Sequence, residues 1–231
     1  GANTMPGGRQ GSEFLWLRTR LAGPAAREPA LYLVTVDQIF MAYLDGQLIY
    51  QFGQLDGSGP QARRFLGYRT HIIPLPPDYA GKRLTLRIYS RHINIGVSGQ
   101  TRVGAAVAIV SLMLQQDIGK AITGVLLGAI GLAMLALFGL QRSDAAYRSY
   151  GGFALTTGLW ILSQMQCRAL LWDAPLCWFT VEIFALYTTV GFLLRYMFLV
   201  FGPGPLKLVK PLSSLYFGYA LGAALLAGIF D

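Results

Sequence analysis

Two patterns of apolar residues divide this chain of 231 residues. In the first half, short stretches alternate between apolar and polar positions. Residues 83–90 are an example, because Leu84, Leu86 and Ile88 fall on one face of an extended chain. From Lys120 onward the chain is almost continuously apolar, in runs too long for strands. The pattern predicts a β domain followed by a bundle of long helices.

Glycine and proline residues separate the alternating stretches of the first half. The sequence "YLDGQLIYQFG" predicts a β-hairpin, because Asp45-Gly46 suits a tight turn of the primed type. Residues 30–44 are too long for one average strand, and we divide them near Asp37-Gln38. Short strands at even spacing indicate an all-β sandwich. Its expected strands lie at residues 14–21, 30–37, 38–44, 47–53, 63–76 and 83–90, within a domain of residues 13–102 that follows a flexible segment of residues 1–12.

Four stretches of the second half are long and apolar enough to cross a hydrocarbon core, which takes about 20 residues. They lie at about residues 121–140, 150–167, 176–201 and 209–230 of a predicted transmembrane bundle, residues 120–231. The connector, residues 103–119, is apolar but ends in Gln115, Gln116 and Asp117. It suits either a last strand or a helix on the membrane surface, and we expect an extended start that turns helical before Asp117.

Composition supports a membrane protein, because 54% of the residues are hydrophobic and only 13% are charged. The loops between the first and second and between the third and fourth predicted spans carry an excess of Lys and Arg, which predicts that they are cytoplasmic. The β domain then lies outside. The net charge of +8 comes from scattered basic residues. No basic cluster is interleaved with aromatic residues, so we expect no nucleic-acid partner.

Three pieces of the first half, "FLWLRTRL", "DQIFMAYLDGQLIYQFG" and "IIPLP…AGKRLTLRIYS", together resemble the galactose-binding-like jelly roll over about residues 13–98. A jelly roll directly before several membrane spans is similar to the bacterial seven-transmembrane receptors with diverse intracellular signalling modules. The resemblance implies an extracytoplasmic sensory domain in the inner membrane. Related sensors carry a diguanylate cyclase or histidine kinase as output, which we expect in a part of the protein missing here. The alternative is a membrane-anchored carbohydrate-binding or assembly component with no signalling role.

The sequence contains no recognisable catalytic set, phosphate loop or metal-ligand spacing, so we expect neither enzymatic activity nor a cofactor in these residues. Beyond membrane lipid, the expected partner is a small molecule or carbohydrate, and a homodimer is left open. The candidates for holding a ligand are the polar and aromatic residues Trp16, Arg18, Tyr68, Arg69, His71, Arg91 and His92. A pocket at the loop ends, as in the similar family, would favour Arg69 and His71 over Arg18.

Two charged residues interrupt the predicted third span and are costly in lipid. Arg195 is close enough to one end to extend its head to the interface, whereas the shorter Glu182 needs a partner, with Arg168 or Gln164 as candidates. The only two cysteines, Cys167 and Cys177, lie at the predicted outer ends of neighbouring spans. They form a disulfide in one interpretation and are small apolar residues at helix ends in the other.

Overall fold

The computed structural model describes residues 12–23, 27–55, 66–91, 95–141, 144–203 and 207–229. The chain divides into two compact units, Gly1–Leu112 and Met113–Asp231, here called the β unit and the helical unit. The division falls inside the predicted connector.

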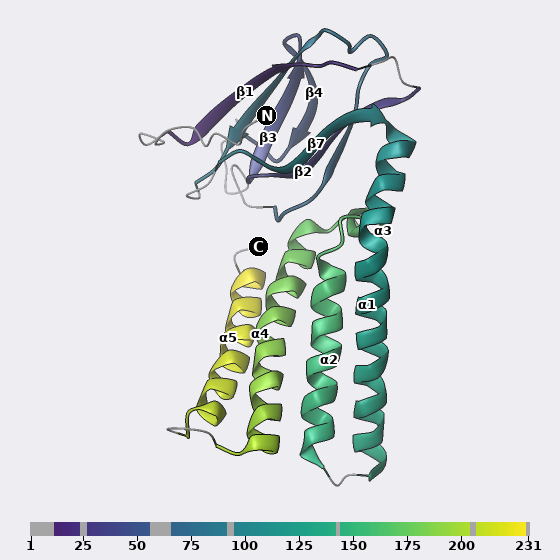
Figure 1. Ribbon diagram of the computed structural model, residues 1–231. Helices are drawn as coiled ribbons and strands as arrows, with labels where there is room; N and C mark the ends of the chain where they lie inside the picture. The colour runs from purple at the N-terminus through teal and green to yellow at the C-terminus, as the bar shows by residue number, and fades with distance from the viewer. Residues whose placement is uncertain are drawn as a thin grey trace. The chain divides into compact units, whose positions relative to one another are not determined.

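The described part of the β unit contains two antiparallel sheets with seven strands between them (Figure 1). The four-stranded sheet has the order β1 (Phe14–Arg20), β6 (Arg83–Tyr89), β3 (Ile39–Leu44), β4 (Gln47–Phe52). The three-stranded sheet has the order β5 (His71–Pro74), β2 (Pro29–Val36), β7 (Val97–Ala105). The predicted antiparallel sheets are confirmed, and jelly-roll connectivity stays a prediction.

The hairpin and the strand break lie where the sequence predicts them. Asp45 and Gly46, with φ angles of 48° and 89°, connect β3 to β4. Positive φ at both central residues defines the primed turn that matches the twist of the two strands. Gln38, also at positive φ, separates β2 from β3. β7 begins at Val97, six residues before the extended start expected for the connector at residue 103. The glycine-containing stretch from Val97 shows no alternation of its own, and pairing with β2 holds it extended.

The two sheets share one core of large apolar side chains. Leu31 and Ile73 of the smaller sheet pack with Phe40 and Ile88 of the larger one, and all four are almost fully buried. A second, smaller cluster on the other face of the four-stranded sheet contains Ile39, Met41, Leu55 and Tyr89. Burial of this apolar area supplies the main driving force for folding of the unit.

Five helices follow β7. They are α1 (Ala106–Gln141), α2 (Ala145–Ser163), α3 (Arg168–Leu171), α4 (Pro175–Phe201) and α5 (Val209–Ile229). The connector has the expected extended start and becomes helical at Ala106. It does not form a separate surface helix, because α1 continues without a break through Gly119-Lys120.

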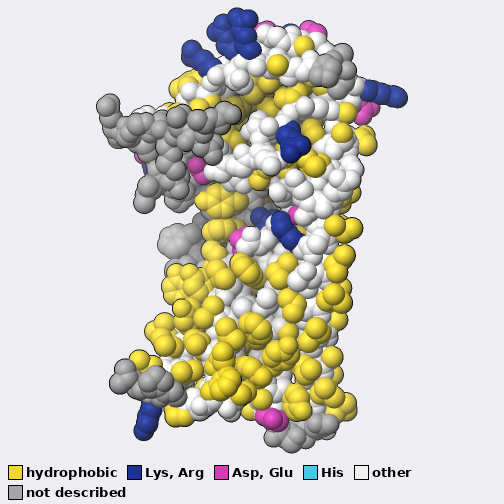
Figure 2. Space-filling model, viewed as in Figure 1, with side chains coloured by type: hydrophobic (Ala, Val, Ile, Leu, Met, Phe, Trp, Pro, Cys, Tyr) yellow, Lys and Arg dark blue, Asp and Glu magenta, His cyan; other side chains and the backbone are white. Residues whose placement is uncertain are grey.

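Two of the helices in the described ranges, Ala106–Leu140 and Pro175–Phe201, are long and apolar enough to cross a membrane. Only 11% and 17% of their most apolar windows are buried, whereas the core helix of a water-soluble protein is mostly buried. Figure 2 shows hydrophobic side chains over much of the visible helical surface. The structure thus supports two of the four predicted spans. As described, α2 and α5 are not both long enough and apolar enough to count as membrane-spanning helices.

Glycines bring the helices of the helical unit close together. A Cβ added at Gly131 of α1 would lie 2.6 Å from the backbone nitrogen of Leu155, and one at Gly158 of α2 would lie 2.6 Å from the carbonyl oxygen of Gly124. Gly191 of α4 likewise faces the ring of Phe217. Such close approach of small residues is typical of helices that pack in lipid.

Candidate functional site

The outer face of the four-stranded sheet carries an exposed aromatic platform. Trp16 lies opposite Arg87 in the β1–β6 register and is 51% exposed. Its ring stacks near that of Tyr43, with 6.5 Å between centroids. The guanidinium of Arg87 lies 5.0 Å from the centroid of Phe14 and 5.6 Å from that of Trp16. Of these aromatic residues Trp16 is the exposed one, and an exposed indole next to a cation suits a ligand that has both an apolar side and polar groups.

A pocket of about 420 Å³ lies on the same sheet and is lined by Arg18, Asp45, Gly46, Arg83 and Thr85. The strand register places Arg18 directly opposite Thr85. The Asp45 carboxylate accepts a hydrogen bond of 2.8 Å from the backbone N–H of Arg83, which fixes the hairpin turn against β6. Two guanidinium groups in one concave site favour an acidic or polyhydroxy ligand. Arg18 therefore lines a pocket, and the preference for Arg69 and His71 over Arg18 as ligand residues stays a prediction.

His71 is a core residue, which corrects its prediction as an accessible ligand contact. It is 1% exposed and lies edge-on to the rings of Phe40 and Phe52, each 4.8 Å away. Its Nδ1 is 3.0 Å from the Tyr50 hydroxyl. Burial, helped by the positive charge of Arg69, lowers the pKa of His71 to about 3 and keeps the ring neutral.

The other predicted ligand residues contact separate neighbours. Arg69 is partly buried with its guanidinium 5.8 Å from the centroid of Phe52. Burial and then the charge of Asp37 raise the pKa of Tyr68. Arg91 is exposed and pairs with Glu13 at 3.5 Å. His92 lies outside the described residues.

A charged pair of α1, absent from the predicted site residues, holds the turn after α2. Asp117 is only 1% exposed, and its carboxylate is 3.1 Å from the Lys120 ammonium. The other carboxylate oxygen accepts a hydrogen bond of 2.8 Å from the backbone N–H of Cys167. Lys120 also donates to the carbonyl oxygen of Gln164 at 3.1 Å. The two side chains therefore satisfy backbone groups that the end of a helix leaves without intrahelical partners.

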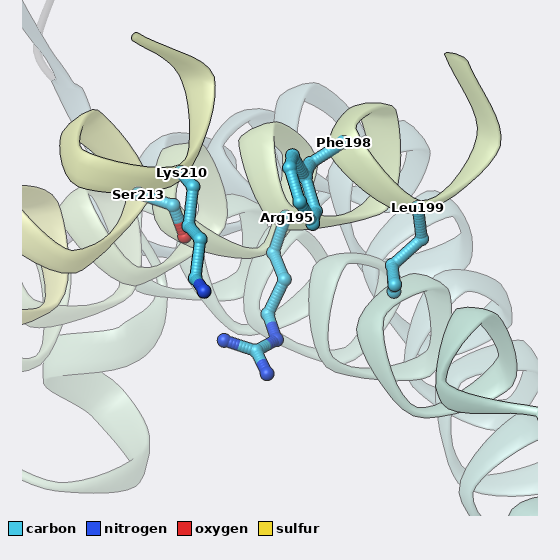
Figure 3. Close-up of a pocket in the computed structure, with 5 residues that line it drawn as sticks. All are labelled: Arg195, Phe198, Leu199, Lys210 and Ser213. Atoms are coloured by element: carbon cyan, nitrogen blue, oxygen red, sulfur yellow. The ribbon is translucent and has the colours of Figure 1, made fainter. Parts of the chain in front are cut away.

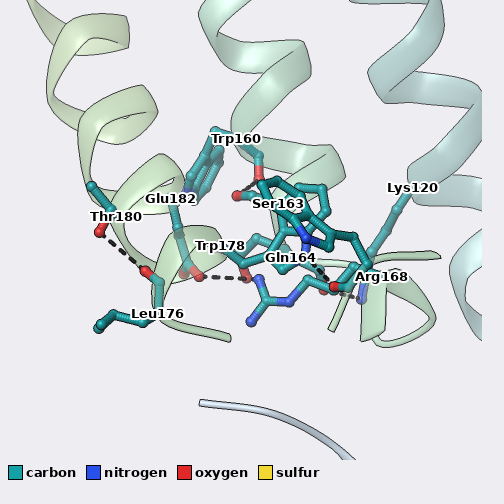
Figure 4. A network of polar contacts seen from close by, with 10 residues as sticks. Lys120, Trp160, Ser163, Gln164, Arg168, Leu176, Trp178, Thr180 and Glu182 are labelled. Atoms are coloured by element: carbon teal, nitrogen blue, oxygen red, sulfur yellow. Dashed lines mark hydrogen bonds and ion pairs between the residues drawn. The ribbon is translucent and has the colours of Figure 1, made fainter. Parts of the chain in front are cut away.

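A second charged pair connects α3 to α4 at the same place (Figure 4). Arg168 lies 3.5 Å from the Glu182 carboxylate, which confirms Arg168 as the partner expected for Glu182. Burial lowers the pKa of Arg168, and the negative charges of Glu182 and Asp117 act in the opposite direction. We call Asp117, Lys120, Arg168 and Glu182 the charge cluster. It contains two acids and two bases, so its formal charges cancel.

Nearby hydrogen bonds hold the segment between α2 and α4. The indole N–H of Trp178 donates to the Trp172 carbonyl at 2.9 Å, and the two rings meet edge to face with 6.2 Å between centroids. The charge cluster therefore lies on an ordered turn. The sequence signal for one pair of the cluster is the spacing of Asp117 and Lys120. They are an acid and a base three residues apart in an apolar stretch, and residues at this spacing are neighbours on a helix.

Of the two interpretations of the cysteines, the disulfide is not formed, and both Cys167 and Cys177 are free thiols. Cys167 is buried in the turn where its backbone bonds to Asp117, whereas Cys177 is exposed in the first turns of α4. The short helix α3 lies between them.

Arg195 of α4 lines a different and smaller pocket, of about 130 Å³, together with Phe198, Leu199, Lys210 and Ser213 (Figure 3). This pocket combines residues of α4 and α5. Among the described residues, no group of three or more His, Cys, Asp or Glu side chains is placed to hold a metal ion.

Comparison with known proteins gives no identification. No family model matches the chain, and neither the curated proteins nor the solved structures contain a match. The function must therefore be argued from the sites themselves.

Proposed function

We propose that this chain is the sensory and membrane part of a bacterial inner-membrane receptor. The β unit lies outside the cytoplasm and binds a carbohydrate-like ligand. The helical unit crosses the membrane four times and carries the signal to an output module outside these residues.

The observation that carries the proposal is the direct continuation of β7 into α1. β7 pairs with β2 up to Ala105, and the next residue, Ala106, begins the helix. The N–H of Ala106 still donates to the carbonyl of Glu28 at 3.0 Å. A shift of β7 in its sheet would therefore act on the first turn of a helix long enough to cross a membrane, with no linker between them to absorb it.

The outer face of the four-stranded sheet supports a carbohydrate-like ligand with acidic or hydroxyl groups. The exposed Trp16 offers apolar area to a sugar beside the cation of Arg87, and Arg18 and Arg83 offer donors to its oxygen atoms. The pocket volume of about 420 Å³ lies in the range of small-molecule sites.

Binding of purified full chain to an array of neutral and acidic oligosaccharides tests the ligand class. We expect Trp16→Ala and Arg18→Ala each to weaken binding about tenfold, the effect of roughly 1.4 kcal/mol. Trp16→Tyr keeps an aromatic ring and should bind nearly as well. Arg102→Ala is the matched control, because Arg102 is an exposed strand arginine whose side chain donates to Gln100 and does not line the pocket. Equal losses for Arg18→Ala and Arg102→Ala would contradict the site.

Hydrogen–deuterium exchange of the same chain separates a receptor from a membrane-anchored binding component. With a bound oligosaccharide from the array, a receptor should change exchange in β7 and beyond it in α1. A change confined to the β unit would favour the anchored component. A periplasm-active reporter fused after Ser98 should be active, and activity of a cytoplasm-only reporter there would reverse the topology.

A further inference from the structure

The pocket between α4 and α5 combines two cations from different helices. Arg195 lies near the end of α4, and Lys210 lies in the first turn of α5. Figure 3 shows both side chains extending to the same side, with Ser213 beside Lys210. The hydroxyl of Ser213 donates to the Gly191 carbonyl at 2.9 Å, so this residue helps to fix α5 against α4.

Among the described residues, the lining of this pocket contains no carboxylate. Three acids of the helical unit serve elsewhere. Asp117 pairs with Lys120, Glu182 pairs with Arg168, and Asp144 caps α2 by accepting from the N–H of Ala146. Two like charges that share a small site repel each other and favour a bound anion.

Both cations line the pocket from the neighbouring ends of α4 and α5. Arg195 lies six residues before the last residue of α4, about 9 Å along the helix, and it lines the same pocket as Lys210. Lys210 is the second residue of α5, where the partial positive charge of the helix end also favours an anion. The rest of the lining, Phe198 and Leu199, is apolar.

We propose that Arg195 and Lys210 bind the phosphate group of an anionic phospholipid at the end of the α4–α5 pair. This inference rests on the proposed membrane location. The volume of about 130 Å³ is well below that of pockets for whole small molecules, so it suits one phosphate, with the lipid tails outside along apolar helix surface. The loop charges that predict a cytoplasmic side for this end also agree with the leaflet rich in anionic lipid.

Native mass spectrometry of the full chain, released from detergent with added lipid, tests the site. We expect the wild type to retain phosphatidylglycerol in preference to phosphatidylcholine. Arg195→Gln and Lys210→Gln should each reduce that preference roughly fivefold, the effect of one cation near an anionic surface. Arg148→Gln is the matched control, because Arg148 is exposed on α2 and lies over the Phe138 ring, outside this pocket. It should keep the preference.

Equal retention of the two lipids by the wild type would overturn the proposal without the need for any variant. Binding of inorganic phosphate without preference for phosphatidylglycerol would overturn the lipid as the source of the anion. Carbonate extraction of cell membranes separates this failure from failure of the proposed location. A chain that stays in the membrane fraction but shows no lipid preference lacks only this site, whereas a chain that is extracted lacks the proposed membrane placement too.

Discussion

The β unit buries large side chains, whereas the helical unit buries mostly small ones. The largest fully buried residues of the β unit include Tyr32, Phe40 and Ile88. In the helical unit the buried residues include Ala154, Ala185, Ala220, Ser149, Ser163 and Ser213. Many of its large apolar residues are exposed, such as Ile118 at 62% and Leu126 at 57%, although Met113 is fully buried.

This difference shows which surroundings each unit suits. In water, removal of large apolar side chains from solvent drives folding. In lipid, helices gain little by burying leucine, and close contact between small residues with a few polar bonds holds them together. The glycine contacts and the charge cluster of the helical unit fit the second case. The comparison therefore supports the membrane location that we propose for this unit.

The largest expected effect comes from truncating a core side chain of the β unit. Phe40 is fully buried against Tyr50, Phe52 and His71, and Phe40→Ala should lower the free energy of unfolding by about 3–5 kcal/mol. Hydrogen exchange of β-strand peptides in increasing urea measures this loss in the detergent-solubilised chain. Leu126→Ala removes an outward-facing side chain of α1 and should change stability by less than about 0.5 kcal/mol. A comparable loss in both variants would break the comparison between the units.

Asp117→Asn should destabilise the helical unit by about 1.5–3 kcal/mol, because it removes the charge of a buried carboxylate that accepts from the Cys167 N–H and pairs with Lys120. Thermal unfolding followed by size-exclusion chromatography of the solubilised chain measures the loss. The control is Asp78→Asn in the β unit, where the Lys82–Asp78 pair lies on an exposed surface. That pair should contribute nothing measurable. If Asp117→Asn also leaves the thermal stability unchanged, the charge cluster does not hold the α2–α3 turn.

Gly131→Ala should destabilise the helical unit by about 1–3 kcal/mol, because the new Cβ would overlap the backbone of α2. Gly139→Ala lies on the same helix in open space and serves as the control, with no loss expected. The same thermal assay compares the two. Equal behaviour of both variants would show that α1 and α2 do not approach as closely as the structure indicates.

The smallest effect is acid sensitivity of the β unit through His71. The unfolded histidine takes up a proton near pH 6.5, whereas the folded one does so only near pH 3. Between these values the unfolded state binds more protons, so stability falls as pH falls, and the loss between pH 6.5 and pH 5.5 is about 1 kcal/mol. Urea unfolding at pH 6.5 and 5.5, followed by exchange of β-strand peptides, should show this loss in wild type. His71→Gln should have lost most of the pH dependence, and an unchanged slope would mean that His71 is accessible to protons when folded.

Local patterns were sufficient for much of the fold. The alternation of residues 83–90 predicted β6, and the Asp45-Gly46 pair predicted both the hairpin and its turn type. The apolar runs predicted α1, α2, α4 and α5 with ends within a few residues, except that α1 begins about fifteen residues earlier than the expected span, at Ala106. These features depend on neighbours in the chain, so periodicity and turn residues are enough to predict them.

The sequence by itself determined that a β domain precedes long apolar helices. It also indicated that Glu182, a carboxylate inside an apolar stretch, pairs with a polar residue of another segment. Only the tertiary structure decided that His71 is enclosed by aromatic rings, that Arg18 lines a pocket, and that Asp117 bonds to the backbone of Cys167, fifty residues away. The physical reason is that these contacts join elements far apart in the chain. Their geometry follows from which faces pack together, and a backbone N–H, the partner of Asp117, is present at every residue except proline and so leaves no signal in the sequence.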